Sequence, residues 1–286
     1  MDVKSALNFS FAANTTYGCG GVAKAAYFPE DEEQAIYIFD KLNSAGQKFF
    51  ILGNGSDVLA QDGVYDGSVI VTKGLNTLLF LPGGEIFCGG GVKVSRLLKE
   101  CIKRGLGGLE YLSGIPATLG GACYMNAGAA DKYISENIVS VTVYDGKKRV
   151  LSKKECNFAY KYSTMRDINC LILGCTLKTE PSSAAKVSES CGYFLKRRKS
   201  LPEGKSCGCV FKNPEGMYAG ALIEKAGLKG VKSGFAKVSE RHCNFIINEG
   251  ARSEDVYNLI VLVKKTVYDK FNIELEEEVC YIGDFK

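Results

Sequence analysis

The stretch YLSGIPATLGGACYMNAG, residues 111–128, limits most strongly what this chain can fold into. Its glycines permit backbone conformations closed to other residues and let a ligand approach the main chain closely. Pro116 fixes the chain after Ile115, Thr118 is placed to cap a helix, and Gly120 with Gly121 would leave backbone N–H groups uncovered for an anion such as a pyrophosphate. A glycine-rich turn between packed elements would use the same residues. Taken alone, the stretch supports both interpretations equally.

A second loop of this kind follows a short apolar segment. Residues 49–52 (FFIL) predict a strand, and it continues directly into Gly53-Asn54-Gly55-Ser56-Asp57. Turn-forming residues after a strand can hold a phosphate, although a lone motif of this kind is more often an ordinary turn. The pair of loops therefore carries more weight than either one.

The remaining pattern alternates strands and helices. Helical spacing with matching end signals predicts helices over residues 32–45, 94–104 and 253–271, and a helical stretch that ends near residue 198. The stripe of Val256, Ile260, Val263 and Val267 predicts the buried face of the last of these. Strands are expected over residues 68–72, 77–81, 85–89, 138–144, 171–178 and 276–283, and a domain boundary near residues 180–183. The sequence thus predicts an α+β protein.

The length and net charge of the chain limit the kinds of protein that it can be. A chain of 286 residues and 31.0 kDa suffices for two modest domains. The net charge of +4 is mild and no long basic run occurs, which argues against nucleic-acid binding. No apolar run reaches the roughly 18 residues of a membrane helix, and the first residues do not resemble a secretory signal. We expect a cytoplasmic protein with neither nucleic-acid nor membrane partners.

The cysteines and the histidine restrict the chemistry. The twelve cysteines are scattered along the chain and lack the spacing of zinc ligands. Most should therefore be reduced thiols that are buried and pack as small apolar side chains. His242 is the only histidine, which makes a multi-histidine metal site impossible and leaves Ser-His-Asp chemistry to that one residue. No metal site is predicted.

Several motifs, in order along nearly the whole chain, resemble one family. The runs FILGNGSDVL (50–59), GLEYLSGIPATLGGA (108–122) and MNAG (125–128) resemble the flavin-binding domain of the UDP-N-acetylenolpyruvoylglucosamine reductases. The runs GCVFKNP (208–214), ALIEKAGLKG (221–230) and VSERHCNFIIN (238–248) resemble their substrate domain. The connection before the last domain is similar to the compact type of the family, which lacks an extra substrate-covering insertion.

The resemblance implies a fold and its division. Residues 1–180 would form an FAD-binding domain of the PCMH or vanillyl-alcohol-oxidase-like type, in two α+β subdomains of approximately 1–75 and 76–180. Residues 181–286 would form a smaller C-terminal α+β substrate-binding domain.

The resemblance also implies an activity. In this family NADPH reduces FAD, and a hydride then passes to the enolpyruvyl group of UDP-GlcNAc-enolpyruvate to give UDP-N-acetylmuramate, a peptidoglycan precursor. The partners would be these small molecules, and the protein would be a monomer or a weak homo-oligomer. Two alternatives remain open: another FAD oxidoreductase or oxidase of the same fold, and a noncatalytic flavin- or UDP-sugar-binding relative.

Three catalytic residues follow from the resemblance. Cys209 stands where the family usually has a serine proton donor, and a thiol can also donate a proton. Glu278 matches the C-terminal glutamate, although LEEEV replaces the more common LxPEV. Lys161 matches the arginine of a YRxS motif; because lysine lacks the planar fork that grips a carboxylate, Arg166 or Arg198 could contribute.

The binding residues follow in the same way. The flavin would be held by the two glycine-rich loops, through Gly53, Asn54, Gly55, Ser56, Asp57, Gly114, Ile115, Gly120, Gly121, Asn126 and Gly128. The substrate would contact Lys212, Asn213, Arg198, Ser239 and Asn244. His242 is interpreted as a structural hydrogen-bonding residue. Ala117 stands where glycine is common in the family, so the flavin would be weakly held if its methyl group blocked the approach.

Overall fold

The computed structural model describes residues 1–285, which cluster into two compact units. The first unit comprises Met1–Ala6, Ala26–Asn54 and Val69–Lys199, and the second comprises Leu7–Ala25, Gly55–Ser68 and the chain from Ser200 onwards. The domain limits of 1–180 and 181–286 stay a prediction, because units defined by compactness do not test where the functional domains divide.

The N-terminal part builds a four-stranded sheet and a helix with clear end signals. The sheet has the order β1-β2-β5-β3, with β1 (Ser5–Ser10), β2 (Val22–Tyr27), β3 (Phe49–Leu52) and β5 (Val64–Val71); α1 (Phe11–Asn14) follows β1. Helix α2 (Glu32–Ser44) begins where the Asp31 side chain accepts a hydrogen bond from the Gln34 N–H at 2.8 Å. Its apolar side, including Ile38 and Phe39, is buried.

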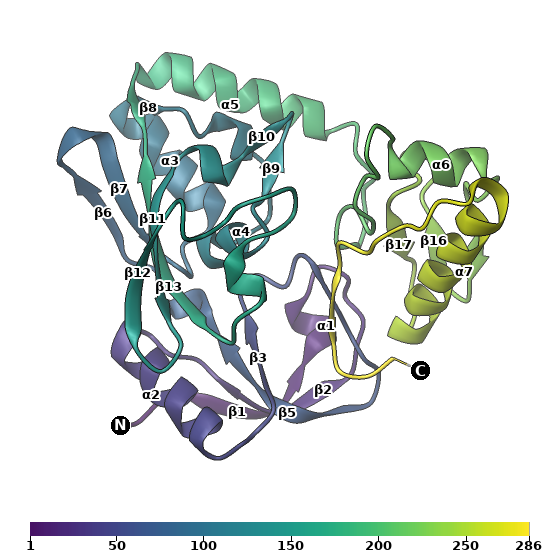
Figure 1. Ribbon diagram of the computed structural model, residues 1–286, viewed down its shortest axis with the longest axis horizontal. Coiled ribbons are helices and arrows are strands. Elements are labelled where there is room, and N and C mark those ends of the chain that lie inside the picture. The colour runs from purple at the N-terminus through teal and green to yellow at the C-terminus, as the bar shows by residue number, and fades with distance from the viewer. Residues whose placement is uncertain (286) are drawn as a thin grey trace. The chain divides into compact units, whose positions relative to one another are not determined.

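The larger sheet of the first unit is antiparallel, and its strands are labelled in Figure 1. Its strand order is β12-β11-β13-β7-β6, with β6 (Leu78–Leu81), β7 (Glu85–Gly89), β11 (Ile138–Tyr144), β12 (Lys148–Ser152) and β13 (Leu171–Lys178). Helices α3 (Val94–Arg104), α4 (Leu119–Tyr124) and α5 (Ala184–Arg198) accompany it; α4 contacts β7 and β13, and α5 packs on α3. Short two-residue pairs, β8 (Leu106–Gly107) with β14 (Glu180–Pro181) and β9 (Gly128–Ala129) with β10 (Lys132–Tyr133), and 3-10 turns at Thr72–Gly74, Pro82–Gly84, Glu110–Leu112, Ile134–Glu136 and Thr164–Arg166 complete the unit.

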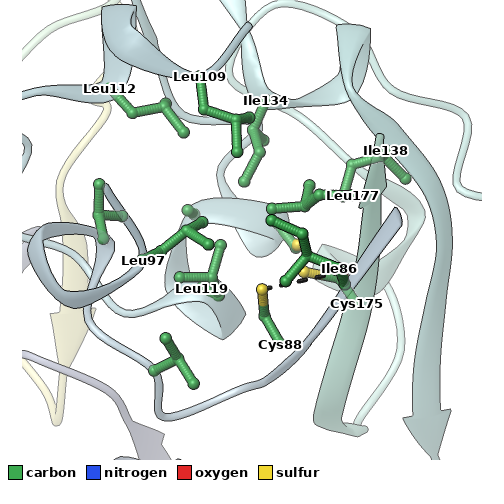
Figure 2. Packing of buried hydrophobic residues seen from close by; sticks show 14 of the residues in the cluster. Ile86, Cys88, Leu97, Leu109, Leu112, Leu119, Ile134, Ile138, Cys175 and Leu177 are labelled. Carbon is green, nitrogen blue, oxygen red and sulfur yellow. Dashed lines mark hydrogen bonds between the residues drawn. The ribbon is translucent and has the colours of Figure 1, made fainter. Parts of the chain in front are cut away.

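The core of this unit lies between the larger sheet and helices α3 and α4. Figure 2 shows Leu97 and Leu119 of the helices facing Ile86 and Leu177 of the sheet, with the thiols of Cys88 and Cys175 side by side. These side chains come from segments that are far apart in the sequence. Their burial fixes α4, and with it the glycine-rich loop that leads into α4.

The second unit is a helix packed on a small sheet. Helix α7 (Ser253–Phe271) contacts the antiparallel strands β15 (Lys232–Ser233), β16 (Ala236–Val238) and β17 (Ile246–Asn248), and α6 (Ala219–Lys225) packs on α7. A separate parallel pair joins β4 (Val58–Ala60) to β18 (Cys280–Ile282). The Asp62 carboxylate accepts hydrogen bonds from the Ser253 and Glu254 N–H groups at 3.2 and 3.0 Å, which satisfies the first turn of α7.

Most expected elements are confirmed within one residue. Helices 94–104 and 253–271 and strands 85–89, 138–144 and 171–178 have the predicted bounds, and the stripe on α7 is buried. The strand expected over 276–283 is wrong in length, because only residues 280–282 form a strand, paired with β4, while Glu277 forms an isolated bridge with Phe211. The strand expected over 68–72 starts at residue 64. All twelve cysteines are free thiols, and ten of them are buried, as predicted.

Candidate active site

The second glycine-rich loop ends at the start of α4. Thr118 occupies the N-cap position, as expected, but its side chain does not cap the helix. The Thr118 hydroxyl is instead buried and has no hydrogen-bond partner within residues 1–285. The Gly120 N–H donates to the Gly90 carbonyl at 2.8 Å, so the expectation of an uncovered N–H at Gly120 is wrong. Glycine is favoured there by close packing, because a β-carbon at Gly120 would lie 3.0 Å from that carbonyl oxygen.

The start of the first glycine-rich loop lies against the second loop. A β-carbon at Gly53 would lie 2.3 Å from the Thr118 hydroxyl oxygen. The Asn54 side chain donates to the Pro116 carbonyl at 2.7 Å. Two segments more than sixty residues apart in the sequence are therefore joined at Gly53, Asn54, Pro116 and Thr118, all within the first unit.

This place fits the diphosphate of a dinucleotide. A buried hydroxyl without a partner is costly unless something satisfies it, and the absence of a side chain at Gly53 makes room for this hydroxyl. The backbone of Ala117 has no positive φ, so the conformation of the loop does not require glycine at this position. The Ala117 carbonyl accepts a hydrogen bond from the Val94 N–H at 3.0 Å. The sequence predicts Thr118 only as a helix cap, and its position between Pro116 and Gly120 is the one signal of a further role.

Arg198 lies beside the same loop. Gly114 has a φ of 79°, which favours glycine, and a β-carbon there would lie 2.7 Å from the Arg198 side chain. Arg198, at the end of α5, thus brings a positive charge to the loop before Ile115. Ile115 itself packs against the core of the first unit.

Asn126 and Gly128 serve the protein's own packing. The Asn126 side chain donates to the Ala159 carbonyl at 2.8 Å and accepts from the Ser135 N–H at 3.2 Å. A β-carbon at Gly128 would lie 2.1 Å from the Lys132 carbonyl oxygen, in the tight β9–β10 pair. Gly121 is open by contrast, since only the Thr118 hydroxyl, at 3.6 Å, approaches the place of a β-carbon.

Lys161 is at the tip of a tight turn. The backbones of Ala159 and Tyr162 pair on either side of it, with N–H to O distances of 3.1 and 3.2 Å. Lys161 has a φ of 55°, in the left-handed region. Arg166, considered from the sequence as a partner for substrate, donates to the Lys161 carbonyl at 2.7 Å.

Cys209 and Glu278 lie on neighbouring segments of the second unit. The Glu278 N–H donates to the Val210 carbonyl at 2.7 Å, directly after Cys209. The Asn244 side chain accepts from the Phe211 N–H at 2.9 Å and donates to the Phe211 carbonyl at 2.8 Å, so it holds this segment as a neighbouring strand would. Cys209 is half-buried and Glu278 is buried.

Asp57 belongs to the same group. The Cys280 N–H donates to the Asp57 carbonyl at 3.0 Å, which follows from the parallel pairing of β4 with β18. Burial raises the pKa of the Cys207 thiol well above its ordinary value, and the nearby charges of Asp57, Glu278 and Cys209 raise it further. Backbone hydrogen bonds therefore join the segments that carry Asp57, Cys209 and Glu278, and the buried Cys207 thiol lies two residues before Cys209.

The neighbouring glutamates clarify the register at Glu278. Glu276 pairs with Lys212 at 2.5 Å, and Glu277 pairs with Lys264 at 2.8 Å. Glu278 is the one of the three that is buried and whose charge acts on Cys207. The match of Glu278 to the catalytic glutamate of the family stays a prediction.

The other expected substrate residues have local partners. Asn213 accepts from the Ala219 N–H at 3.0 Å. The Ser239 hydroxyl accepts from the N–H groups of Arg241 and His242 at 3.1 and 3.4 Å. His242 accepts from the Asn244 N–H at 3.3 Å, and burial lowers its pKa, which agrees with a structural role.

Two further features concern the described residues as a whole. Within residues 1–285 no cluster of three or more histidine, cysteine or acidic side chains could hold a metal ion. No helix in the same range is both long and apolar enough to cross a membrane.

Comparisons with known proteins place these features in a class. The FAD binding domain family matches residues 23–152, which include both glycine-rich loops. The cholesterol oxidase of B. sterolicum is similar to 63% of this chain and 38% of its own, with a TM-score of 0.50 and 14% identity, and shares the fold alone. The family match over residues 23–152 defines an FAD-binding protein.

The match of the remaining residues identifies the family of FAD-binding proteins to which the chain belongs. Residues 199–282 match the C-terminal domain of UDP-N-acetylenolpyruvoylglucosamine reductase. The reductase of that name from Moorella thermoacetica is 38% identical over 97% of this chain and 93% of its own. The crystal structure of the reductase from Thermus caldophilus has a TM-score of 0.83 and 32% identity, covering 98% of this chain and 99% of that one. The chain belongs to the UDP-N-acetylenolpyruvoylglucosamine reductase family, which confirms the resemblance and the expected fold class.

Proposed function

We propose that the protein reduces UDP-GlcNAc-enolpyruvate to UDP-N-acetylmuramate with NADPH, with Cys209 as proton donor. The family supports the reaction, and the backbone hydrogen bonds that join the segments of Cys209, Glu278 and Asp57 in the second unit are the observation that supports the assignment. A cytoplasmic location and a monomeric or weakly oligomeric state are further parts of this proposal.

The reaction needs a proton donor and charge stabilisation. FAD, when bound, supplies a hydride acceptor for NADPH and a hydride donor for the β-carbon of the enol ether. Hydride addition leaves negative charge on the α-carbon and its carboxylate, and a proton must reach that carbon. Cys209 donates this proton from its thiol. Two residues before the donor, burial and the carboxylates of Asp57 and Glu278 raise the pKa of the Cys207 thiol.

Charge stabilisation falls to cationic side chains. Lys161 offers its ammonium group to the substrate carboxylate, as a point charge rather than a bidentate fork. Arg198 lies against Gly114 and is placed to meet a phosphate near the flavin loop. Lys212 pairs with Glu276, so contact with the UDP diphosphate would require the lysine to exchange partners.

The first experiment tests the reaction. The purified protein should show a flavin spectrum and oxidise NADPH in a manner that depends on UDP-GlcNAc-enolpyruvate. NADPH oxidation that is indifferent to this substrate would refute the proposal. Oxygen consumption with small alcohols, without a response to the nucleotide sugar, would instead indicate an oxidase, and ligand binding without turnover would indicate a noncatalytic relative.

The second experiment tests Cys209. The Cys209→Ala variant should still let NADPH reduce the flavin, while reoxidation by the enolpyruvyl substrate slows by about 10²-fold or more. Cys209→Ser should recover much of the rate, because a hydroxyl can donate the same proton. Cys243→Ala is a matched control, since it removes a buried thiol of the same unit that takes no part in the proposed chemistry. Equal reoxidation rates in Cys209→Ala and the wild type would exclude this donor.

A further inference from the structure

Arg166 makes contacts that are directed at the turn of Lys161. Its guanidinium donates to the Lys161 carbonyl oxygen at 2.7 Å and lies 5.7 Å from the centre of the Tyr124 ring. The first contact is a charge-assisted hydrogen bond, and the second is within the range of a cation–π interaction. Arg166 therefore links the tip of the turn to the end of α4.

The turn needs such support because Lys161 is strained. Its φ of 55° lies in the left-handed region, which is unfavourable for a residue with a β-carbon. Strained residues persist when their surroundings fix them, and they concentrate at functional sites. The turn keeps this conformation although Lys161 carries a β-carbon, so its surroundings must fix it.

Other side chains fix the same turn to the flavin-loop region. Asn126 holds the Ala159 carbonyl at 2.8 Å, on one side of the turn. The buried Ser163 hydroxyl donates to the Tyr124 carbonyl at 2.8 Å, on the other side. Arg166 alone among these three bonds the backbone of Lys161 itself.

We propose that Arg166 is a positioning residue for the reduction of the enolpyruvyl substrate: its hydrogen bond to the Lys161 carbonyl holds the strained turn in the conformation that presents the Lys161 ammonium group to the substrate carboxylate. The proposal rests on the proposed function, in which Lys161 binds that carboxylate. A lysine binds a carboxylate with less directional preference than an arginine does, because its single ammonium group cannot form two parallel hydrogen bonds to it. Its placement must come from the backbone, and Arg166 fixes that backbone.

The test uses the purified flavoprotein and separates the two half-reactions by stopped flow. Arg166→Met keeps an apolar stem over Tyr124 and removes the donor. We expect flavin reduction by NADPH to stay within about twofold of the wild type, while kcat/KM for UDP-GlcNAc-enolpyruvate falls about tenfold, mainly through KM. Arg166→Lys retains a cationic donor and should recover part of the loss.

A double-mutant cycle distinguishes positioning from general stabilisation. If Arg166 acts through Lys161, the variant with both Lys161→Ala and Arg166→Met should lose no more kcat/KM than Lys161→Ala alone. Arg96→Met is the matched control, because Arg96 also donates to a backbone carbonyl, that of Asn76 at 2.6 Å, in the same unit. Arg96→Met should leave kcat/KM unchanged.

The possible results distinguish a failure of the proposed reaction from a failure of the positioning role of Arg166. A wild type that does not use UDP-GlcNAc-enolpyruvate refutes the proposed function. An active wild type in which Lys161→Ala slows the second half-reaction but Arg166→Met does not refutes the positioning role. Additive losses in the double variant, or a Lys161→Ala variant without effect, also refute it. If Arg166→Met is purified without flavin, the double-mutant cycle is repeated with Arg166→Lys in its place. Additive losses of kcat/KM in that cycle would refute the positioning role.

Discussion

The replacement of Asn244 by alanine tests how the segment that carries Cys209 is held. Asn244 is buried, and its side chain makes two hydrogen bonds of 2.9 and 2.8 Å with the backbone of Phe211. Phe211 is itself almost inaccessible to solvent. Removal of the amide would therefore leave a buried N–H and a buried carbonyl without partners.

The expected loss in the free energy of unfolding follows from the two backbone groups of Phe211 that lose their partners. A buried polar group that loses its partner costs about 1–3 kcal/mol, so two such groups give about 2–6 kcal/mol. Water that enters the truncated space would recover part of this energy. We expect the free energy of unfolding to fall by about 2–4 kcal/mol. Because the Glu278 N–H bonds the adjacent Val210 carbonyl, the spacing of Cys209 and Glu278 should loosen as well, and flavin reoxidation should slow.

Urea unfolding followed by far-UV circular dichroism measures the change, since the chain has no tryptophan to report it by fluorescence. The control is Asn258→Ala, the same substitution at an exposed position of α7, which should change stability by less than about 0.5 kcal/mol. If Asn244→Ala were as stable as the control and reoxidised its flavin at the wild-type rate, the backbone-holding role of Asn244 would be wrong.

Three further predictions concern the cofactor, the substrate and pH. Gly53→Ala would place a methyl group 2.3 Å from the unpartnered threonine hydroxyl, so the purified protein should contain less FAD by absorbance, whereas Gly192→Ala, with open space around it, should not; equal flavin content would contradict the loop assignment. Lys161→Arg restores a bidentate fork and should lower KM for UDP-GlcNAc-enolpyruvate in steady-state assays; a raised KM would indicate that the site is shaped for lysine. Burial raises the pKa of the Cys101 and Cys170 thiols to about 12, so above an ordinary pKa of about 8.5 the unfolded chain loses protons that the folded protein keeps. The free energy of unfolding should therefore fall between pH 8 and pH 10, by about 2 kcal/mol for each thiol, and Cys170→Ala should show a weaker fall; an unchanged pH dependence in that variant would contradict the shift.

The sequence predicted those elements whose signals are local. Helix α3 ends at Gly105, where a φ of 63° favours glycine, and its basic last turn was visible in the sequence. The buried stripe of α7 followed from helical periodicity alone. The strand expected over residues 276–283 was too long, because pairing with β4 stops after three residues and no local signal marks that limit.

The sequence by itself determined the class of the protein, because ordered motifs along nearly the whole chain are specific to one family. It also supplied the chemical groups, among them the thiol of Cys209, the carboxylate of Glu278 and the ammonium of Lys161. Only the tertiary structure decided which backbone groups these residues use, that Thr118 is a buried hydroxyl facing Gly53, and that backbone hydrogen bonds join the segments of Asp57, Cys209 and Glu278. The physical reason is that such contacts join segments many tens or hundreds of residues apart, and their energies depend on burial, which no local pattern records.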